Sequence, residues 1–376
     1  MPFQMQGIGE LAAFYIHLLE EGLYKTIECM RILITGNLGY VGPGVVKELR
    51  AFIPNVSVEG FDIGYFARNI TNALVSPDIY LDRQHYGDVR RFPQEILKGV
   101  DAVVSLAAIS NDPIGNQFEA ETLSINYEAN VAIAKLAKRL GVNRFIFASS
   151  CSVYGSAEEQ PRKENSSLNP LTAYARSKIL SEEALRELAD EDFQVTCLRF
   201  ATACGMSDRL RLDLVLNDFV AGALASGIID ILSDGTPWRP LIHVNDMARA
   251  IRWAIEKPKG YGGDFLSVNT GSNNWNYQVH DLAYAVQAIM PDLEVRIDKN
   301  AAPDKRSYKV NFDLFKELAP DHQPLFDLNS AVHDIHKGLK SIGFTNSDFR
   351  ESNFMRLNVI KDLVENGVLD ANLSLQ

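Results

Sequence analysis

The chain has 376 residues, of which 46% are hydrophobic, and its 48 acidic side chains outnumber its 37 basic ones, giving a formal net charge of −11. This balance is typical of a globular protein with one large or two ordinary domains, and it excludes a wholly disordered chain. Because an acidic surface repels a polyanion, we expect no binding of nucleic acid, although a few local Arg or Lys residues could still hold a small phosphate-bearing ligand.

Residues 1–29 precede the first regular strand. The spacing of their apolar side chains predicts a helix that carries Leu11, Tyr15, Leu18 and Leu19 on one side. His17, Glu20 and Glu21 interrupt the stretch well short of a membrane-spanning length, so we expect neither a signal peptide nor a membrane helix. The pattern leaves open whether this extension is a packing or oligomer element or reflects a start codon placed too early.

The four cysteines predict reduced thiols rather than disulfides or a metal site. The four residues are Cys29, Cys151, Cys197 and Cys204. They form no CxxC pair, and no histidine lies near them at metal-ligand spacing. A chain of this length needs no disulfides to be stable, so we expect a cytoplasmic protein.

From Met30 onward, apolar strands alternate with helices. The patterns predict strands at 30–35, 56–62, 101–108, 144–150 and 194–200, and helices at 45–52, at 122–140 and after Tyr174. Such alternation indicates an α/β fold with a doubly wound parallel sheet that is buried on both faces. The alternation of strands and helices becomes irregular after about Phe200, and this predicts a smaller second lobe. We therefore divide the chain into 1–29, 30–200, 201–343 and a helical tail at 344–376.

The segment ITGNLGYVG places Gly36, Gly39 and Gly42 between a strand and a helix. Glycines there permit a tight turn and let a pyrophosphate approach the helix N-terminus, although a plain glycine turn is the alternative. The next strand ends in Asp62, where a carboxylate would bind ribose hydroxyls and repel a 2′-phosphate. This favours NAD over NADP, with Arg68 as the nearby residue that would suit NADP instead. Asp88 either reaches the adenine or is a solvated loop carboxylate.

Tyr174 is followed one helical turn later by Lys178. A free tyrosine has a pKa of about 10 and is a poor base, but a lysine ammonium one turn away favours the phenolate. That phenolate can accept the hydroxyl proton of an alcohol while hydride passes to a nicotinamide. Ser150, in the cluster SSCSVYG after a predicted strand, could bond the same substrate oxygen. An ordinary helix-face pair and a serine turn are the alternatives.

Taken together, these motifs resemble the extended short-chain dehydrogenase/reductases of the nucleotide-sugar epimerase/dehydratase group, typified by UDP-galactose 4-epimerase. The resemblance spans about residues 30–343 and rests on TGNLGYVG, SLAA, SSCSVYG, YARSK and WRPLIHVNDMARA. It implies a Rossmann-type NAD-binding domain at 30–200 and, at 201–343, mainly a substrate-binding lobe, from which some segments return to the sheet. It also implies a nucleotide-sugar substrate and a homodimer. Ser150 then corresponds to the catalytic serine, Tyr174 to the base and Lys178 to the lysine that binds the nicotinamide ribose.

The same resemblance implies a wider set of binding residues and no metal ligand. The residues expected to bind NAD, besides Tyr174 and Lys178, are Gly36, Asn37, Leu38, Gly39, Tyr40, Val41, Gly42, Asp62, Asp88, Val89, Leu106, Ala107, Ala108, Asn126 and Ser149. Those expected to bind the nucleotide sugar are Ser110, Ser150, Asn217, Arg239 and Arg306.

Two departures from the group's pattern bear on the reaction. Dehydratases and uronate decarboxylases of the group carry acidic residues directly after the catalytic Ser or Thr, where this chain has Cys151 and Ser152. Pro240 and Leu241 replace an Asp and an aromatic residue after Arg239. We therefore expect an NAD-dependent epimerase that oxidises the sugar transiently at C4. A 4-ketoreductase ranks second and a 4,6-dehydratase with relocated acids third, and an NAD-binding sensor or scaffold is the non-enzymatic alternative. For Cys151 and Cys204 a buried inert thiol is favoured, and for His243 a satisfied core or interface histidine.

Overall fold

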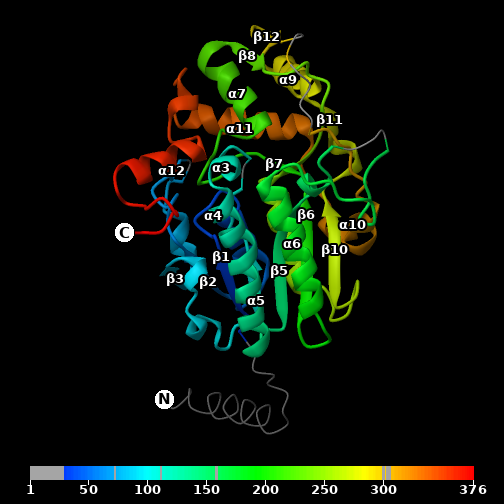
Figure 1. Cartoon of the computed structure of the whole chain (residues 1–376). Helices are drawn as coiled ribbons and strands as arrows, with labels where there is room; N and C mark the ends of the chain where they lie inside the picture. The colour runs from blue at the N-terminus through cyan, green and yellow to red at the C-terminus, as the bar shows by residue number, and fades with distance from the viewer. Residues whose placement is uncertain (1–28, 72, 111, 157–159, 299–300, 302–305) are drawn as a thin grey trace, which may run out of the picture.

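The computed structural model describes residues 29–376 except 72, 111, 157–159, 299–300 and 302–305, so the helix expected at 1–29 lies outside the described residues. Its centre is a sheet of seven strands, all parallel, as Figure 1 shows. The strand order is β10 (Phe265–Thr270), β6 (Gln194–Phe200), β5 (Arg144–Ser150), β4 (Ala102–Ser105), β1 (Arg31–Thr35), β2 (Ser57–Asp62) and β3 (Arg83–Tyr86). The doubly wound parallel sheet expected from the sequence is confirmed.

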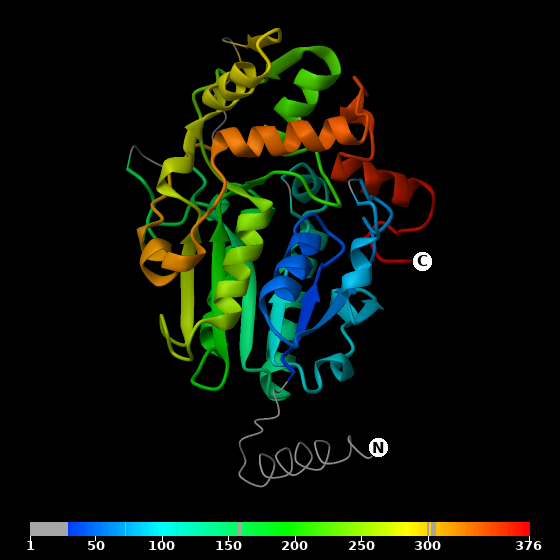
Figure 2. The ribbon, with the colours of Figure 1, turned by 180° about the vertical axis from the view of Figure 1, so that it is seen from behind.

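Helices cover both faces of this sheet because its strands are apolar on both sides. On β1, Ile32 and Ile34 pack into one hydrophobic layer, whereas Leu33 packs into the other. The first layer is formed by α2 (Gly42–Phe52), α8 (Val244–Glu256) and α10 (Asp313–Leu318), seen in Figure 2. The second is formed by α3 (Asp112–Gln117), α5 (Asn130–Arg139), α6 (Ala173–Leu188) and α12 (Arg356–Glu365), and α4 (Glu119–Leu123) packs against α6.

The long helix predicted at 122–140 is interrupted. The chain passes from α4 through a π-helical turn at Ser124–Ala129 into α5. Asn126 lies in this turn and its side-chain amide bonds both backbone groups of Ile109, at 2.8 and 2.9 Å. The widened turn thus anchors the loop after β4, a contact that apolar periodicity alone does not reveal.

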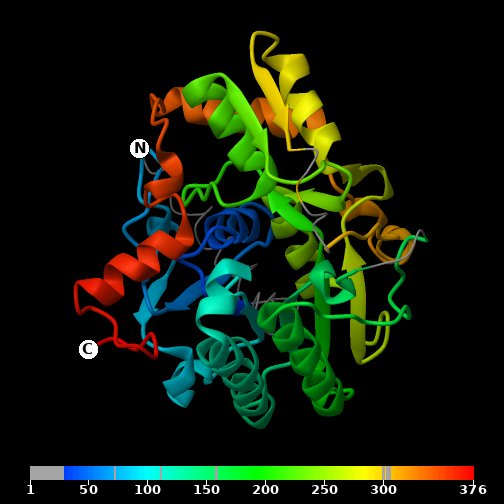
Figure 3. The same ribbon diagram turned by 45° about the horizontal axis from the view of Figure 1, so that its top comes forward.

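The second lobe lies across the carboxyl ends of the central strands (Figure 3). It contains α7 (Val215–Ser226), α9 (Val279–Ile289) and α11 (Leu328–Ser341), a sheet of β11 (Asn276–Gln278), β9 (Trp238–His243) and β7 (Thr202–Cys204), and the pair β8 (Ile228–Ile231) and β12 (Glu294–Ile297). Short 3₁₀ turns lie at Pro77–Tyr80, Val89–Arg91, Gln94–Leu97, Cys151–Tyr154, Asn273–Trp275, Pro320–His322 and Phe349–Glu351.

The C-terminal segment returns to the first domain and packs beside its β3 edge (Figure 1). The Tyr65 hydroxyl donates to the carbonyl of Leu373, and the Arg90 guanidinium donates to the carbonyls of Asn372 and Leu373 at 2.7 and 3.0 Å. Residues 344–376 therefore form part of the wall around the end of the sheet. No helix in the described part of the chain is long and apolar enough to cross a membrane.

Candidate active site

A cavity of about 1020 Å³ opens between the carboxyl ends of the central strands and the second lobe. Its wall is formed by the turn after β1, the ends of β2, β4 and β5, the start of α6, the second lobe and α12. In open α/β sheets this edge is where ligands bind.

The glycine turn at the start of α2 has the geometry of a phosphate cradle. Gly36 has φ +76°, and a Cβ there would lie 2.5 Å from the backbone nitrogen of Ala107. A Cβ on Gly42 would lie 1.9 Å from the carbonyl oxygen of Asn37, so neither position accepts a side chain. No side chain caps the N-terminus of α2. Apart from Pro43, which has no backbone N–H, the first residues of α2 therefore present N–H groups to an anion, and this fits the pyrophosphate of a dinucleotide.

Asp62 lies at the end of β2 and lines the cavity. Its carboxylate accepts hydrogen bonds from the backbone N–H of Leu38 at 3.0 Å and of Gly64 at 2.7 Å. Burial raises the pKa of Asp62, and these two N–H groups oppose that shift. The carboxylate is thus fixed in place with acceptor capacity left for ribose hydroxyls. Arg68 is exposed and lies outside the cavity wall, so the residue that would suit NADP does not face it.

Asp88 also lines the cavity, but its carboxylate is engaged by Arg90. The Arg90 guanidinium donates to it at 2.7 to 3.0 Å, and the Arg90 backbone N–H donates at 2.9 Å. This pairing fixes the loop after β3 against the C-terminal segment. The alternative of a solvated loop carboxylate is therefore wrong, and the contact of Asp88 with the adenine stays a prediction.

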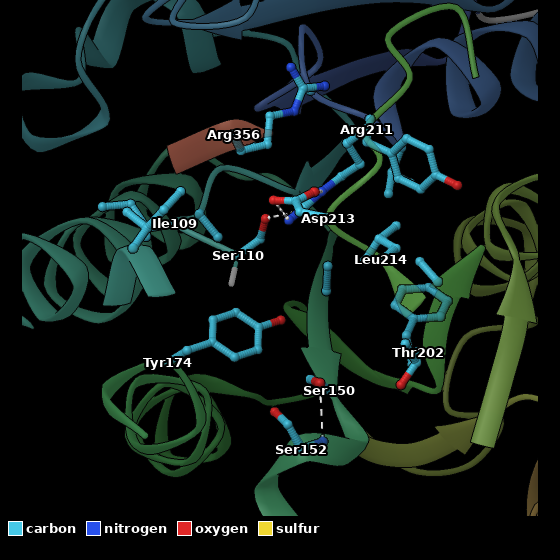
Figure 4. Close-up of a pocket in the computed structure, with 18 of the residues that line it drawn as sticks. Ile109, Ser110, Ser150, Ser152, Tyr174, Thr202, Arg211, Asp213, Leu214 and Arg356 are labelled. Carbon is cyan, nitrogen blue, oxygen red and sulfur yellow. Dashed lines mark hydrogen bonds and ion pairs between the residues drawn. The ribbon is translucent and has the colours of Figure 1, made fainter. Parts of the chain in front are cut away.

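Ser150, Tyr174 and Lys178 meet on one side of the cavity. Ser150 ends β5 and its Oγ accepts from the N–H of Ser152 at 3.1 Å. Tyr174 lies in the first turn of α6, which Thr172 caps, and its hydroxyl points into the hollow that Ser150 also faces (Figure 4). Lys178 follows one turn later, with its Nζ 5.4 Å from the centre of the Tyr174 ring. A secondary alcohol placed here could contact the tyrosine and the serine together.

Lys178 is buried, with 2% of its surface exposed, and its ammonium donates to the carbonyl of Ala148 at 2.7 Å. Burial lowers the pKa of Lys178 to about 8, and the nearby carboxylate of Glu182 opposes the shift. Glu182 is in turn bonded by Arg199 at 2.7 to 3.1 Å, and it also accepts from the hydroxyl of Ser149. Tyr174, Lys178 and Glu182 thus lie on successive turns of α6, and Glu182 forms a buried ion pair with Arg199.

The two residues after Ser150 carry no acid. Cys151 is fully buried, its thiol donates to the Arg199 carbonyl at 3.0 Å, and burial raises its pKa. This confirms the expected inert thiol, and Cys204 is likewise buried with a raised pKa. Ser152 lines the cavity, and its buried Oγ has no hydrogen-bond partner within the described structure.

Most of the residues expected to bind cofactor or substrate line this cavity, and five do not. Those on its wall, besides the catalytic three and Asp62 and Asp88, are Gly36, Gly39, Tyr40, Val41, Val89, Leu106, Ala107, Ala108, Ser110, Ser149, Arg239 and Arg306. The five outside the wall are Asn37, Leu38, Gly42, Asn126 and Asn217. Asn37, Leu38 and Gly42 shape the glycine turn from behind it, where Asn37 bonds Gln84 at 2.6 Å.

Asn126 and Asn217 were expected to bind cofactor and substrate, but the side-chain amide of each is hydrogen-bonded to backbone groups. The Asn126 amide bonds Ile109, as described above. The Asn217 amide accepts from the N–H of Gly205 and donates to the carbonyl of Arg211, each at 3.0 Å. Both residues are fully buried. They hold the loops that form the cavity and do not reach into it.

Arg239 and Arg306 lie together at the part of the wall that belongs to the second lobe. Arg239 donates to the carbonyl of Arg306 and, at 2.9 Å, to that of Trp238. The sequence separates these arginines by 67 positions, but the structure brings them to one place. His243, on the same strand as Arg239, is fully buried, stacks on Phe326 and bonds Asp334 at 3.0 Å, as a satisfied core histidine should.

Sequence reasoning missed several cavity residues: Thr202, Arg211, Asp213, Leu214 and Arg356. Arg211 forms two hydrogen bonds to Asp213, at 2.5 and 2.9 Å, and donates to the Ser110 hydroxyl at 2.8 Å (Figure 4). The charged run RLRLD within an otherwise apolar stretch was the available signal, because such charges are buried only when paired. Arg356 lies beyond the motifs and gave no comparable signal.

Comparison with known proteins identifies the family. The sequence model of the NAD dependent epimerase/dehydratase family matches residues 32–268, more than half of the chain. The chain belongs to this family. It is therefore an enzyme of the NAD-dependent epimerase/dehydratase type, and its cofactor is NAD.

The relatives differ from one another in the reaction that they catalyse. The chain is 26% identical over 292 residues to UDP-glucose 4-epimerase of Bacillus subtilis, covering 69% of this chain and 82% of that protein. It is 24% identical over 299 residues to UDP-glucuronic acid decarboxylase 6 of Arabidopsis thaliana, covering 77% and 83%. The fold matches MoeE5 in complex with UDP-glucuronic acid and NAD with a TM-score of 0.71 at 22% identity, over 83% of this chain and 99% of that one.

Proposed function

We propose that this family member is a nucleotide-sugar epimerase that acts by transient oxidation of the sugar at C4. The observation that carries the proposal is the composition of the cavity wall. Ser150, Tyr174 and Lys178 share this wall with the glycine turn, whereas the two positions after Ser150 hold Cys151 and Ser152. The hydride-transfer groups are thus present without the adjacent acids that dehydration requires.

NAD⁺, when bound, accepts hydride from the sugar carbon and returns it. Gly36, Gly39 and the N-terminus of α2 would hold its pyrophosphate, and Asp62 its adenosine ribose. Lys178 would bind the nicotinamide ribose. Its ammonium charge favours the Tyr174 phenolate, which takes the proton of the 4-hydroxyl as the carbon becomes a ketone. Ser150 donates a hydrogen bond to the same oxygen.

Inversion follows from what Tyr174 and Ser150 can and cannot do to the ketone. They hold and reprotonate its oxygen, but they do not reach the C5 hydrogen in that role. The ketone therefore keeps its C5–H and C6–OH bonds, turns its other face to the hydride and is reduced again. Arg239 and Arg306, at the second-lobe side of the wall, would anchor the substrate diphosphate during that rotation. Ser110 would contact the sugar.

Among the alternatives, a dehydratase with a relocated acid has one residue in its favour. Asp213 faces the same hollow as Tyr174 and Ser110 (Figure 4). Its carboxylate, however, already accepts two hydrogen bonds from Arg211. A carboxylate held by a guanidinium is stabilised in its charged form, which makes it a poor proton donor. The ion pair thus leaves Asp213 poorly suited to protonate the departing 6-hydroxyl, a step that dehydration requires.

A substrate screen in heavy water tests the proposal. The enzyme is incubated with UDP-, GDP-, CDP- and dTDP-sugars, and the products are read by mass and NMR. We expect an unlabelled product inverted at C4. Deuterium at C5 with loss of the 6-hydroxyl would refute the epimerase and select the dehydratase. Turnover only with added NADH and a ready-made keto sugar would select a 4-ketoreductase, and bound NAD without any turnover would select a sensor or scaffold.

We also propose a homodimer built on α5 and α6. Leu180 is 38% exposed on α6, and Ala184 and Leu188 on the same helix are half-buried. Two copies that paired these helices would cover apolar side chains in a self-complementary contact. Light scattering at micromolar concentration should give twice the chain mass, and a monomer would contradict the proposal.

The thiols support a cytoplasmic location. All four cysteines are free, and three of them, Cys151, Cys197 and Cys204, are buried. Such thiols suit a reducing compartment. Fractionation of cells that express the tagged chain should recover it in the cytoplasm, and recovery elsewhere would contradict the assignment.

A further inference from the structure

Arg356 is a cavity residue supplied by the C-terminal segment, outside the region that the family model matches. It is the first residue of α12, and only 2% of its surface is exposed. Figure 4 shows it on the wall of the hollow opposite Tyr174. A guanidinium so deeply buried needs partners that compensate its charge.

The neighbouring arginines have such partners. Arg209 pairs with Asp78 at 3.0 Å, and Arg211 pairs with Asp213 at 2.5 Å. Each of these charges is thus compensated by a carboxylate, although Nε and Nη1 of Arg209 are buried without a hydrogen-bond partner in the described structure.

Arg356 is bound differently. Its Nη2 donates to the carbonyl of Arg209 at 2.8 Å, and its guanidinium stacks over the ring of Phe66 at 4.2 Å. Its Nη1 is buried without a hydrogen-bond partner, and no carboxylate of the described residues lies within ion-pair distance. Burial and the nearby charges of Arg211 and Arg209 lower its pKa to about 9. A cation in this state is stabilised by an anion bound in the cavity.

The position of Arg356 indicates which ligand carries that anion. Phe66, on which Arg356 stacks, lies four residues after Asp62, the residue placed to bind the adenosine ribose. The carboxylate of Asp62 is also close enough to raise the pKa of Arg356, against the effect of burial. Ile360, one turn along α12, lines the same cavity. The arginines suited to the substrate diphosphate, Arg239 and Arg306, belong to the second-lobe part of the wall instead. Apart from its pyrophosphate, NAD presents no anionic group to this side of the cavity.

We propose that Arg356 binds the pyrophosphate of NAD, so that helix α12 is part of the cofactor site. The glycine turn and the N-terminus of α2 then hold the pyrophosphate from one side and the guanidinium from the other. The inference rests on the cofactor of the family and not on which sugar is epimerised.

Binding measurements on the full chain without substrate test this role. Dissociation constants of NAD, NADP, ADP-ribose and UDP are measured by calorimetry for the wild-type protein and for Arg356→Met, Arg356→Lys and Lys361→Met. Lys361 is an exposed cation on the same helix, so its replacement removes equal charge away from the cavity. Arg356→Met should weaken NAD and ADP-ribose about tenfold to hundredfold, the range for a hydrogen bond to a charged group, and leave UDP unchanged. Arg356→Lys should recover part of the loss, and Lys361→Met should have no effect.

Thermal unfolding separates binding from a structural role. Without ligand, Arg356→Met removes an uncompensated buried charge and should keep or raise the melting temperature, whereas saturating NAD should raise it less than in wild type. A lower melting temperature with unchanged NAD affinity would mean a structural role and overturn the proposal. Loss of UDP binding alone would assign Arg356 to the substrate, and loss of NADP binding alone would assign it to a 2′-phosphate; either result overturns it. Wild-type protein that binds NAD but does not epimerise sugars would contradict the proposed function and leave this inference standing.

Discussion

Replacing Lys178 by methionine should change how the stability of the ligand-free protein depends on pH. The ammonium is buried, and its pKa is about 8 against an ordinary value of 10.5. Between these two values the unfolded chain keeps the proton that the folded chain has released. The unfolded state then binds more protons, so the free energy of unfolding rises with pH across this window.

The size of the effect follows from the pKa difference. About 2.5 pKa units at 1.36 kcal/mol each correspond to a penalty of about 3 kcal/mol below pH 8, which disappears as the pH approaches 10.5. Urea unfolding of the wild type and of Lys178→Met from pH 7 to pH 10 measures it. The wild type should gain about 2 kcal/mol relative to the variant over that range. Because other titrating groups, such as Lys257, contribute equally to both proteins, they cancel in the difference. If the difference in free energy of unfolding between the two proteins stays constant with pH, the reasoning that burial destabilises the Lys178 ammonium is refuted.

Four further variants test separate parts of the site. Asp62→Ala should weaken NAD about tenfold or more and narrow its advantage over NADP, measured by titrating both cofactors; an unchanged ratio would contradict the ribose assignment. Tyr174→Phe should abolish nearly all turnover while retaining NAD, whereas Ser150→Ala should slow the same step less; single-turnover rates and NAD titration distinguish these outcomes. Glu182→Gln should lower the free energy of unfolding in urea by about 3 to 5 kcal/mol, because it leaves the Arg199 guanidinium buried without its carboxylate. A decrease below about 1 kcal/mol would contradict the conclusion that Glu182 compensates the buried charge of Arg199.

The fold was predictable because its strands are apolar runs with clear ends. The strands expected at 144–150 and 194–200 have those bounds in the structure. The π-helical turn at Ser124–Ala129 was not predictable, because its cause is a contact between Asn126 and the backbone of Ile109, 17 positions away. Periodicity reports which face of a helix is apolar and not which polar side chain holds a distant loop.

The same limit applies to the site. Short motifs place Gly36, Tyr174 and Lys178 because their spacing is fixed by one turn or one helix. Arg211 and Arg356 enter the cavity from segments that meet only in the folded chain. The charged run RLRLD indicates at most that Arg211 is paired, and no local pattern marks Arg356. Asn217 shows the opposite error: the sequence predicted that it binds substrate, but its side-chain amide is hydrogen-bonded to the backbone of Gly205 and Arg211.

Isotope transfer at C4 tests the proposed reaction most directly. The nucleotide sugar that the enzyme converts is prepared with deuterium at C4 and incubated in ordinary water with the NAD-loaded enzyme, and the product is analysed by NMR. Transient oxidation by a tightly held cofactor predicts a product inverted at C4 that retains its deuterium there, with the hydrogen at C5 unchanged. A product that has lost the C4 deuterium to solvent, or one that has lost its 6-hydroxyl, would contradict the account.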